Sequence, residues 1–105
     1  FVSEHKKRYN NMPPDFFTCG GFAAAAAMIA GINKAKSVDS EKLKAAMSGM
    51  HFQTPKGEMV FRKSDQQALQ FMFVFKLRNE DGVDWAIPEL VKELTWKDMD
   101  IPSGR

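Results

Sequence analysis

The sequence predicts an α/β fold in which helices pack on a sheet, and two segments carry this prediction. In residues 69–77 a large apolar side chain recurs at every second position, which is typical of an extended strand. One face of this strand holds Leu69, Phe71, Phe73, Phe75 and Leu77. Residues 19–35 are rich in alanine, the best helix former. Burying a phenylalanine side chain is worth roughly 1.5–3 kcal/mol, so we expect helices to cover the aromatic face of the strand.

The composition limits the chain to one modest core and indicates no charged partner. The 105 residues are 44% hydrophobic and 27% charged, an ordinary globular balance. The formal net charge of +2 is too small to indicate a nucleic-acid surface. The single cysteine, Cys19, excludes an internal disulfide and a cysteine-based zinc cluster. The longest apolar run, residues 19–32, is well short of the ~20 residues that span a bilayer.

Two helices are expected on either side of a proline pair. Residues 1–11 carry aromatic or histidine side chains at every fourth position, which favours a helix with one apolar stripe. Pro13 and Pro14 stop it, because proline lacks a backbone N–H and restricts the residue before it. Thr18 is the expected N-cap of a helix over residues 19–35. That helix is apolar nearly all round, so we expect it to be buried between the sheet and a neighbouring helix.

Two glycines at the start of this helix invite an explanation. Gly20 and Gly21 each cost roughly 1 kcal/mol of helix stability relative to alanine. One explanation is close packing against a neighbouring element. The other is that bare backbone at a helix N-terminus can approach a ligand or an anion.

The second half of the chain begins with a capped helix and a hairpin. Asp39 is expected to cap a helix that Gly49 ends. Residues 55–57, Pro-Lys-Gly, predict a turn, because proline fixes φ and glycine tolerates a positive φ. A short strand follows at residues 58–62, and a polar break separates it from residues 69–77.

The last part of the chain is expected to contain a turn, a short helix and a tail. An Asn-Glu-Asp-Gly sequence after the aromatic strand predicts the turn. Pro88 is expected at the first position of a terminal helix over residues 89–95. Residues 98–105 hold no periodic pattern, so this tail either frays or packs through Trp96 and Ile101.

The segment before the aromatic strand carries a family resemblance. Residues 54–67 read Thr-Pro-x-Gly-x-x-x-Phe-Arg-x-x-Asp-x-Gln. This order resembles the C-terminal part of the branched-chain amino-acid binding proteins, which are type I periplasmic solute-binding proteins of ABC importers. The likeness extends upstream over residues 1–9, 13–14, 22–24, 36–39 and 42–43. Gln66 stands where many relatives have histidine and Phe22 where tyrosine is usual, which leaves the subgroup and its ligand open.

The resemblance implies that the chain is a C-terminal fragment of a two-lobed type I periplasmic-binding-protein fold. Residues 1–53 would form the helical part of the N-terminal-type lobe. Residues 54–67 would form a hairpin and the last hinge crossing, and residues 68–105 the strand and terminal helix. The isolated chain is then expected to pair with itself or with the remainder of its parent through residues 69–77, because strand edges without partners bind other chains.

The resemblance also implies a function. It indicates a periplasmic or extracellular solute-binding component, with or without a lipid anchor, that passes an amino acid or other small carboxylate to a membrane permease. In that family the loop before the small-residue helix faces a cleft between the lobes. Here that loop is residues 16–19, and Phe17, Thr18 and Cys19 are the expected ligand-binding residues. The alternative is that Phe16 and Phe17 are core residues beside the alanine-rich helix.

The sequence contains no catalytic or metal-binding motif. Cys19 could meet His5 or His51 only through folding, and the chain has no nucleophile elbow, phosphate loop or HExxH sequence. We therefore expect no enzyme, no metal, no cofactor and no nucleic-acid partner. Two alternatives to a transport protein stay open, namely a ligand-binding sensory ectodomain of the same fold and a self-contained α+β interaction module.

Overall fold

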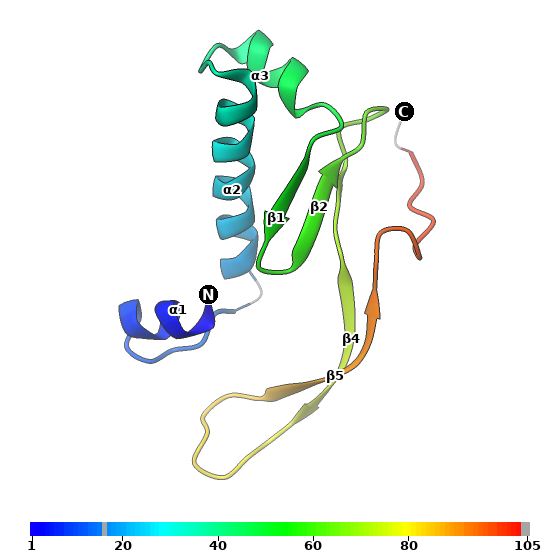
Figure 1. Cartoon of the computed structure of the whole chain (residues 1–105). Coiled ribbons are helices and arrows are strands. Elements are labelled where there is room, and N and C mark those ends of the chain that lie inside the picture. The colour runs from blue at the N-terminus through cyan, green and yellow to red at the C-terminus, as the bar shows by residue number, and fades with distance from the viewer. Residues whose placement is uncertain (16, 104–105) are drawn as a thin grey trace.

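The computed structural model describes residues 1–15 and 17–103. Within them, helices lie beside a small sheet, and a separate two-stranded hairpin leads away from both (Figure 1). The elements are α1 (Val2–Arg8), α2 (Thr18–Ala35), α3 (Ser40–Met47), β1 (His51–Thr54), β2 (Gly57–Phe61), β3 (Ala68–Leu69), β4 (Met72–Arg78) and β5 (Ile87–Leu94). The strands β1, β2 and β3 form one antiparallel sheet, and β4 pairs antiparallel with β5. The predicted α/β class is confirmed.

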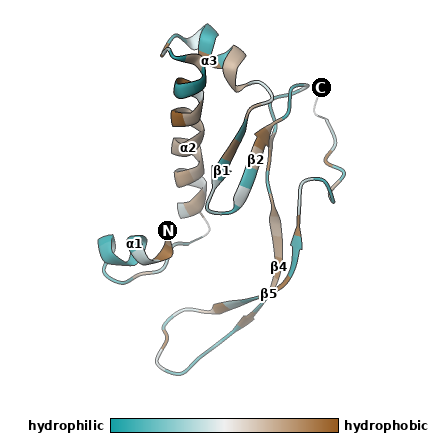
Figure 2. Cartoon of the chain, viewed as in Figure 1, coloured by the Kyte–Doolittle hydropathy of each residue, from teal (hydrophilic) through white to brown (hydrophobic). Residues whose placement is uncertain are grey.

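The core lies between α2 and the β1–β2 hairpin. Its buried side chains are those of Ala23, Ala27, Met50, Phe52 and Met59. The Phe52 and Phe61 rings stack with their centroids 5.3 Å apart. The small alanine side chains let α2 run close beside β1 and β2, and Figure 2 shows that α2 is apolar over most of its length. The expected packing of a helix on a sheet is therefore present at this contact.

The helix α2 packs against both β1 and α3, as predicted, but only one of its faces is buried. It buries Ala23, Ala27 and Gly31, whereas Met28 and Ile29 on other faces are more than half exposed. Close packing explains Gly31, which is not one of the two glycines, Gly20 and Gly21, for which the sequence suggested it. A Cβ on Gly31 would stand 2.8 Å from the Met47 side chain of α3.

The other helix signals give mixed outcomes. Asp39 caps α3 as predicted, because its carboxylate accepts a hydrogen bond of 3.2 Å from the Lys42 N–H. The predicted N-cap role of Thr18 is wrong, since Thr18 is the first residue of α2 and Phe17 occupies the cap position without a side-chain hydrogen bond of its own. The Asp15 side chain supplies acceptors there instead.

The aromatic strand differs from its prediction in two ways. It is split at residues 70–71 into β3 and β4. In addition, every residue of β4 is exposed, and the exposed fraction of its large apolar side chains runs from 37% for Phe73 to 65% for Leu77. The radius of gyration is 16.6 Å, against about 13 Å for a compact domain of this size. The expected cover on the aromatic face is therefore absent from the described part of the chain.

The predicted terminal helix over residues 89–95 is wrong, because this segment is the strand β5. Leu90, Val91 and Leu94 fit a helical stripe, and the pattern gave no sign of a partner strand. The partner is β4, which pairs with β5 along the whole strand apart from a register shift between Val74 and Phe75. An ion pair of 2.7 Å between Arg78 and Glu89 links the two strands. Long-range pairing thus overrides the local helix signal.

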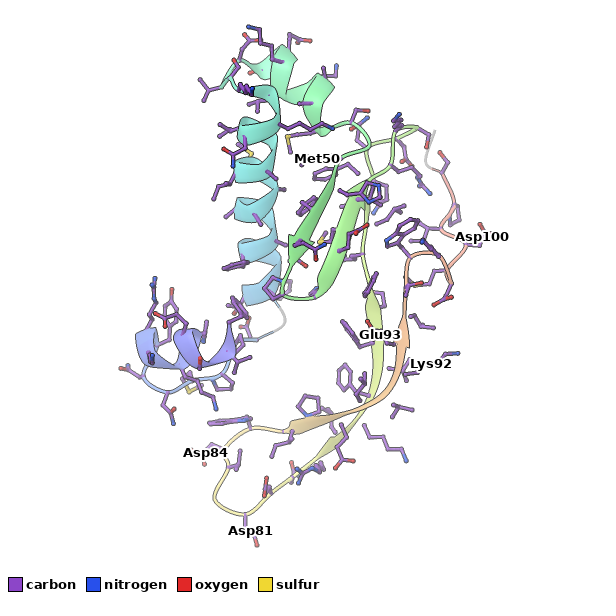
Figure 3. All side chains as sticks on the ribbon, viewed as in Figure 1. Met50, Asp81, Asp84, Lys92, Glu93 and Asp100 are labelled. Atoms are coloured by element: carbon purple, nitrogen blue, oxygen red, sulfur yellow. The ribbon has the colours of Figure 1, made fainter. Side chains whose placement is uncertain are left out.

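Figure 3 shows Lys92 and Glu93 along β5, and Asp81 and Asp84 in the connection between the strands.

The tail after β5 packs rather than frays over its described residues. It runs back toward β2 (Figure 1), where Arg62 binds the carbonyl oxygens of Ile101 and Pro102. The Trp96 ring lies 6.5 Å from the His51 ring, measured between centroids, in an edge-on arrangement.

Candidate functional site

The loop before α2 is held in shape by one carboxylate. Asp15 Oδ1 accepts hydrogen bonds from the backbone N–H groups of Phe17 and Thr18, both at 3.0 Å, and from the Thr18 hydroxyl at 2.7 Å. The same hydroxyl accepts a bond of 3.2 Å from the Asp15 N–H. Asp15 and Thr18 therefore bind each other in both directions, and this arrangement fixes the chain where it enters the helix.

The charge of Asp15 is favoured by this geometry. The Thr18 hydroxyl bond, followed by the backbone bonds from Thr18 and Phe17, lowers the pKa of the Asp15 carboxyl below its usual value. A carboxylate at the start of a helix is further favoured by the positive end of the helix dipole. Asp15 is therefore a fixed negative charge beside the loop at neutral pH.

The three predicted ligand-binding residues are consecutive where the loop meets α2: Phe17 occupies the N-cap position, and Thr18 and Cys19 begin the helix. Phe17 is 79% exposed, whereas Thr18 and Cys19 are half-buried. The alternative that Phe17 is a core residue is wrong for this structure. Phe16, which belongs to the same predicted loop, lies outside the described residues.

The first turn of α2 is open at its glycines. No neighbouring heavy atom of the described residues lies within 4 Å of the position that a Cβ would take on Gly20 or Gly21. Close packing within the described chain therefore does not explain these two glycines. Bare backbone beside an exposed phenylalanine is a surface that a small molecule can approach closely.

A hollow of about 530 Å³ lies beside Thr18, between α1 and the start of α2. Its lining residues are Phe1, Glu4, His5, Arg8, Tyr9, Thr18 and Phe22. The Phe1 and Phe22 rings meet edge to face with their centroids 5.0 Å apart, and the His5 and Tyr9 rings are 4.5 Å apart. The aromatic stripe predicted within residues 1–11 forms one wall of this hollow, but no local pattern indicated that Phe22 would complete it.

Each histidine ring makes a contact through Nδ1 that does not involve Cys19. His5 donates from Nδ1 to the Met12 carbonyl at 3.0 Å, since a carbonyl can only accept. His51 pairs across the β1–β2 hairpin with Glu58 at 2.6 Å. Among the described residues, no three His, Cys, Asp or Glu side chains gather closely enough to hold a metal ion. The described helices also include none that is long and apolar enough to cross a membrane.

The chain is similar to a family of known proteins and to several solved structures. A family model described as periplasmic binding protein matches residues 1–82. No curated protein matches the chain. Solved structures also match, among them three from Rhodopseudomonas palustris.

The first, from strain CGA009, is described as an ABC-type branched-chain amino acid transporter. It is 58% identical to this chain with a TM-score of 0.89, and the match covers 96% of this chain and 27% of that one. The second, an ABC transporter, is 64% identical with a TM-score of 0.63, and the match covers 73% of this chain and 23% of that one.

The third, from strain BisB5, is a solute-binding protein of an ABC transporter in complex with 3,4-dihydroxybenzoic acid. It has 23% identity and a TM-score of 0.79, and the match covers 90% of this chain and 26% of that chain. At that identity it supports the fold alone. The chain thus spans about a quarter of the length of these three structures.

Proposed function

The chain belongs to the periplasmic binding protein family, and from this premise we propose that it forms one wall of a solute-binding cleft. The complete protein would bind a small solute in the periplasm and deliver it to the membrane permease of an ABC importer. The observation that carries the proposal is the loop of residues 15–19, where Asp15 holds an exposed Phe17 beside two open glycines.

The chemistry of this loop suits the apolar part of a solute. Phe17 offers a large apolar surface, and an aromatic wall with a few fixed polar groups is what a small-molecule cleft requires. Asp15 places a negative charge nearby, and this charge would repel the carboxylate of a solute at this wall. We therefore propose that Phe17 contacts the side chain of the solute. The carboxylate of the solute would then bind at the opposite wall of the cleft. Thr18 shapes the loop through Asp15, and Cys19 lies next to it.

The proposed solute is an amino acid or another small carboxylate. One observation on a relative supports this class. The 58% identical structure is described as a branched-chain amino acid transporter.

The proposal is tested with the protein encoded by the complete reading frame that contains this chain. Titration calorimetry would measure its affinity for branched-chain amino acids and for small aliphatic and aromatic carboxylates. Burying a phenylalanine is worth roughly 1.5–3 kcal/mol, so Phe17→Ala should weaken binding of the best solute by about tenfold or more.

A matched control is Val38→Ala. Val38 is 78% exposed, almost as much as Phe17, and it lies in the connection between α2 and α3. This variant should bind with the affinity of the unaltered protein. Equal affinities for the Phe17→Ala and Val38→Ala variants would contradict the assignment of the loop to the cleft.

A further inference from the structure

The β4–β5 hairpin is joined to the rest of the molecule by two connections. Residues 70–71 lead out from β3 to β4, and residues 95–103 lead back from β5 toward the end of β2 (Figure 1). Every residue of β4 is exposed, so packing restrains the strands little, and the contact with α1 is that of the Lys6 ammonium, 5.4 Å from the Trp85 ring in the connection between the strands. The orientation of the hairpin therefore depends on how firmly each connection is held.

The outgoing connection is held by the β1–β2 turn. The Phe71 ring lies over Gly57, where a Cβ would stand 3.0 Å from the ring. The Lys56 ammonium reaches the Gln70 side-chain oxygen at 3.5 Å. One residue earlier, Leu69 is buried and pairs with Val60 of β2. This short connection can still turn about the backbone dihedrals of residues 70–71.

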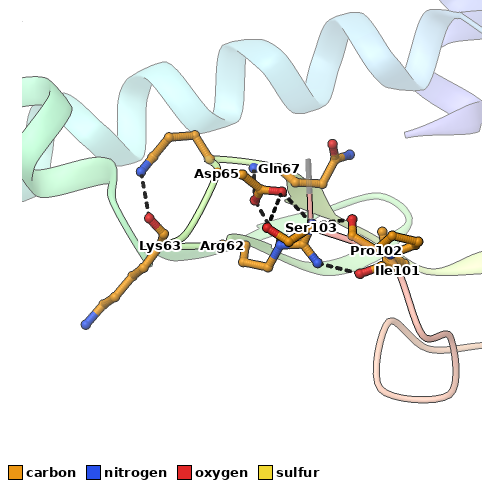
Figure 4. A network of polar contacts seen from close by, with 8 residues as sticks. Arg62, Lys63, Asp65, Gln67, Ile101, Pro102 and Ser103 are labelled. Carbon is orange, nitrogen blue, oxygen red and sulfur yellow. Dashed lines mark hydrogen bonds and ion pairs between the residues drawn. The ribbon is translucent and has the colours of Figure 1, made fainter. Parts of the chain in front are cut away.

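The returning connection is held by Arg62, at the end of β2. The guanidinium donates to both oxygens of Asp65, from Nε at 2.8 Å and from Nη2 at 2.6 Å (Figure 4). Asp65 also accepts from the Gln67 N–H at 3.1 Å, which fixes the polar break after β2. The side chain of Asp65 is only 7% exposed.

The remaining donors of Arg62 reach the tail. Nη1 donates to the Ile101 carbonyl at 2.7 Å, and Nη2 also donates to the Pro102 carbonyl at 2.9 Å. The Ser103 hydroxyl lies 3.5 Å from Asp65 Oδ2. The planar fork of a guanidinium can bind a carboxylate and two carbonyl groups together, whereas the ammonium of lysine is a single point charge on a flexible stem.

We propose that Arg62 is a positioning residue that clamps the tail to the sheet and so limits the swing of the β4–β5 hairpin. With the clamp closed, the hairpin is tethered at both ends, and any rotation must bend both connections. With the clamp open, the Trp96–His51 and Lys6–Trp85 ring contacts remain in addition to residues 70–71, and a few dihedral changes at residues 70–71 can then reorient the hairpin much further. The device depends on residues of this chain alone and not on which solute is bound.

The test is a measurement of the distance between the helical part of the molecule and the β4–β5 hairpin. Dyes on Ser40→Cys and Glu93→Cys, in a Cys19→Ser background, report the separation of α3 from β5 by single-molecule energy transfer. Both labelled positions are exposed. Arg62→Ala should broaden the distance distribution and speed amide hydrogen exchange in residues 95–103. Arg62→Lys should broaden it as well, because lysine cannot reproduce the fork.

Two further variants make the test decisive. Arg78→Ala removes another arginine with two ion pairs, to Glu80 and Glu89, but leaves the tail contacts in place. It should keep the original distribution. A chain that ends at Asp100 loses the carbonyl acceptors while Arg62 and Asp65 remain paired, and it should behave as Arg62→Ala does.

Circular dichroism and thermal melting identify which variants keep α2 and the core folded, and the distances are compared among those. An unchanged distribution in the truncated chain would overturn the proposal, even where Arg62→Ala fails to fold. An equal broadening in Arg78→Ala would overturn it as well, since the effect would then not depend on the tail.

Discussion

Asp15 orders the candidate loop with a single side chain. Its carboxylate accepts the N–H groups of Phe17 and Thr18 and the Thr18 hydroxyl. An exposed phenylalanine on a loose loop would lose much conformational entropy on binding a solute, and a loop that is already ordered reduces that loss. Under the proposed function, Asp15 therefore shapes this wall of the cleft, and its negative charge would contribute to selectivity.

The pKa of Asp15 predicts how the loop responds to acid. Because hydrogen bonds from Thr18 and Phe17 lower this pKa below the usual value of about 3.9, the carboxylate stabilises the loop above that pH. The stabilisation is lost as the pH falls through the lowered folded-state value. Hydrogen exchange at the Phe17 and Thr18 amides, corrected for the intrinsic rate, should therefore accelerate in strong acid.

Asp15→Asn should show faster exchange at these amides already at neutral pH. Asp98→Asn is the matched control, because the pKa of Asp98 is also lowered, by the backbone N–H and hydroxyl of Thr95. It should leave exchange at Phe17 and Thr18 unchanged. If Asp15→Asn exchanges like the unaltered chain, Asp15 does not hold the loop.

Local signals in the sequence predicted the elements that short-range contacts decide. Asp39 as a cap and the turn at residues 55–57 required only neighbouring residues. At the candidate site the family resemblance pointed to Thr18, whereas local reasoning missed Asp15, because the proline pair beside it indicated a helix stop. An acidic residue three positions before a threonine was the available signal, since each can cap the other.

The strand β5 marks where local reasoning failed. Its apolar spacing fits a helix, and only pairing with β4, across a turn and several further residues, decides otherwise. The clamp is similar, because Arg62 and the Ile101 carbonyl are 39 residues apart in the sequence. Contacts between residues so far apart in the sequence follow from the chain topology. The pattern of neighbouring residues does not encode that topology.

At the scale of elements, the structure predicts that stability comes from the α2–β1–β2 contact and not from β4. Phe52 is 7% exposed, so Phe52→Ala should lower the free energy of unfolding by about 3–5 kcal/mol. Phe75 is half exposed on β4, and Phe75→Ala should cost about 0.5 kcal/mol or less. Urea denaturation measures both values. Equal losses would mean that the aromatic strand belongs to the core after all.

At the scale of the whole molecule, the hairpin leaves apolar surface uncovered. An apolar groove of about 770 Å³ lies between β4–β5 and residues 12–15, and Phe73, Phe75 and Leu90 are among the residues that line it. In the described two-stranded sheet, β4 and β5 each keep one edge without a strand partner. Uncovered apolar faces and open strand edges favour association with other chains.

The 105-residue chain, studied alone, should therefore associate with itself through β4. Phe73→Lys should disrupt this association, because the introduced charge would be buried without a partner. Val38→Lys places the same charge on a site that is 78% exposed and lies away from the hairpin, and it should leave the association unchanged. Light scattering that shows a folded monomer at all concentrations would contradict this expectation.

The central claim is that the chain supplies one wall of a solute cleft whose other wall lies outside residues 1–105. The most direct test is titration calorimetry on the 105-residue chain alone, in parallel with the protein from the complete reading frame, using the same amino acids and small carboxylates. A cleft of this kind buries most of its ligand between two walls. The complete protein should therefore bind at least one of these solutes saturably, and the chain alone should show no saturable heat. Saturable micromolar binding by the chain alone would contradict the claim.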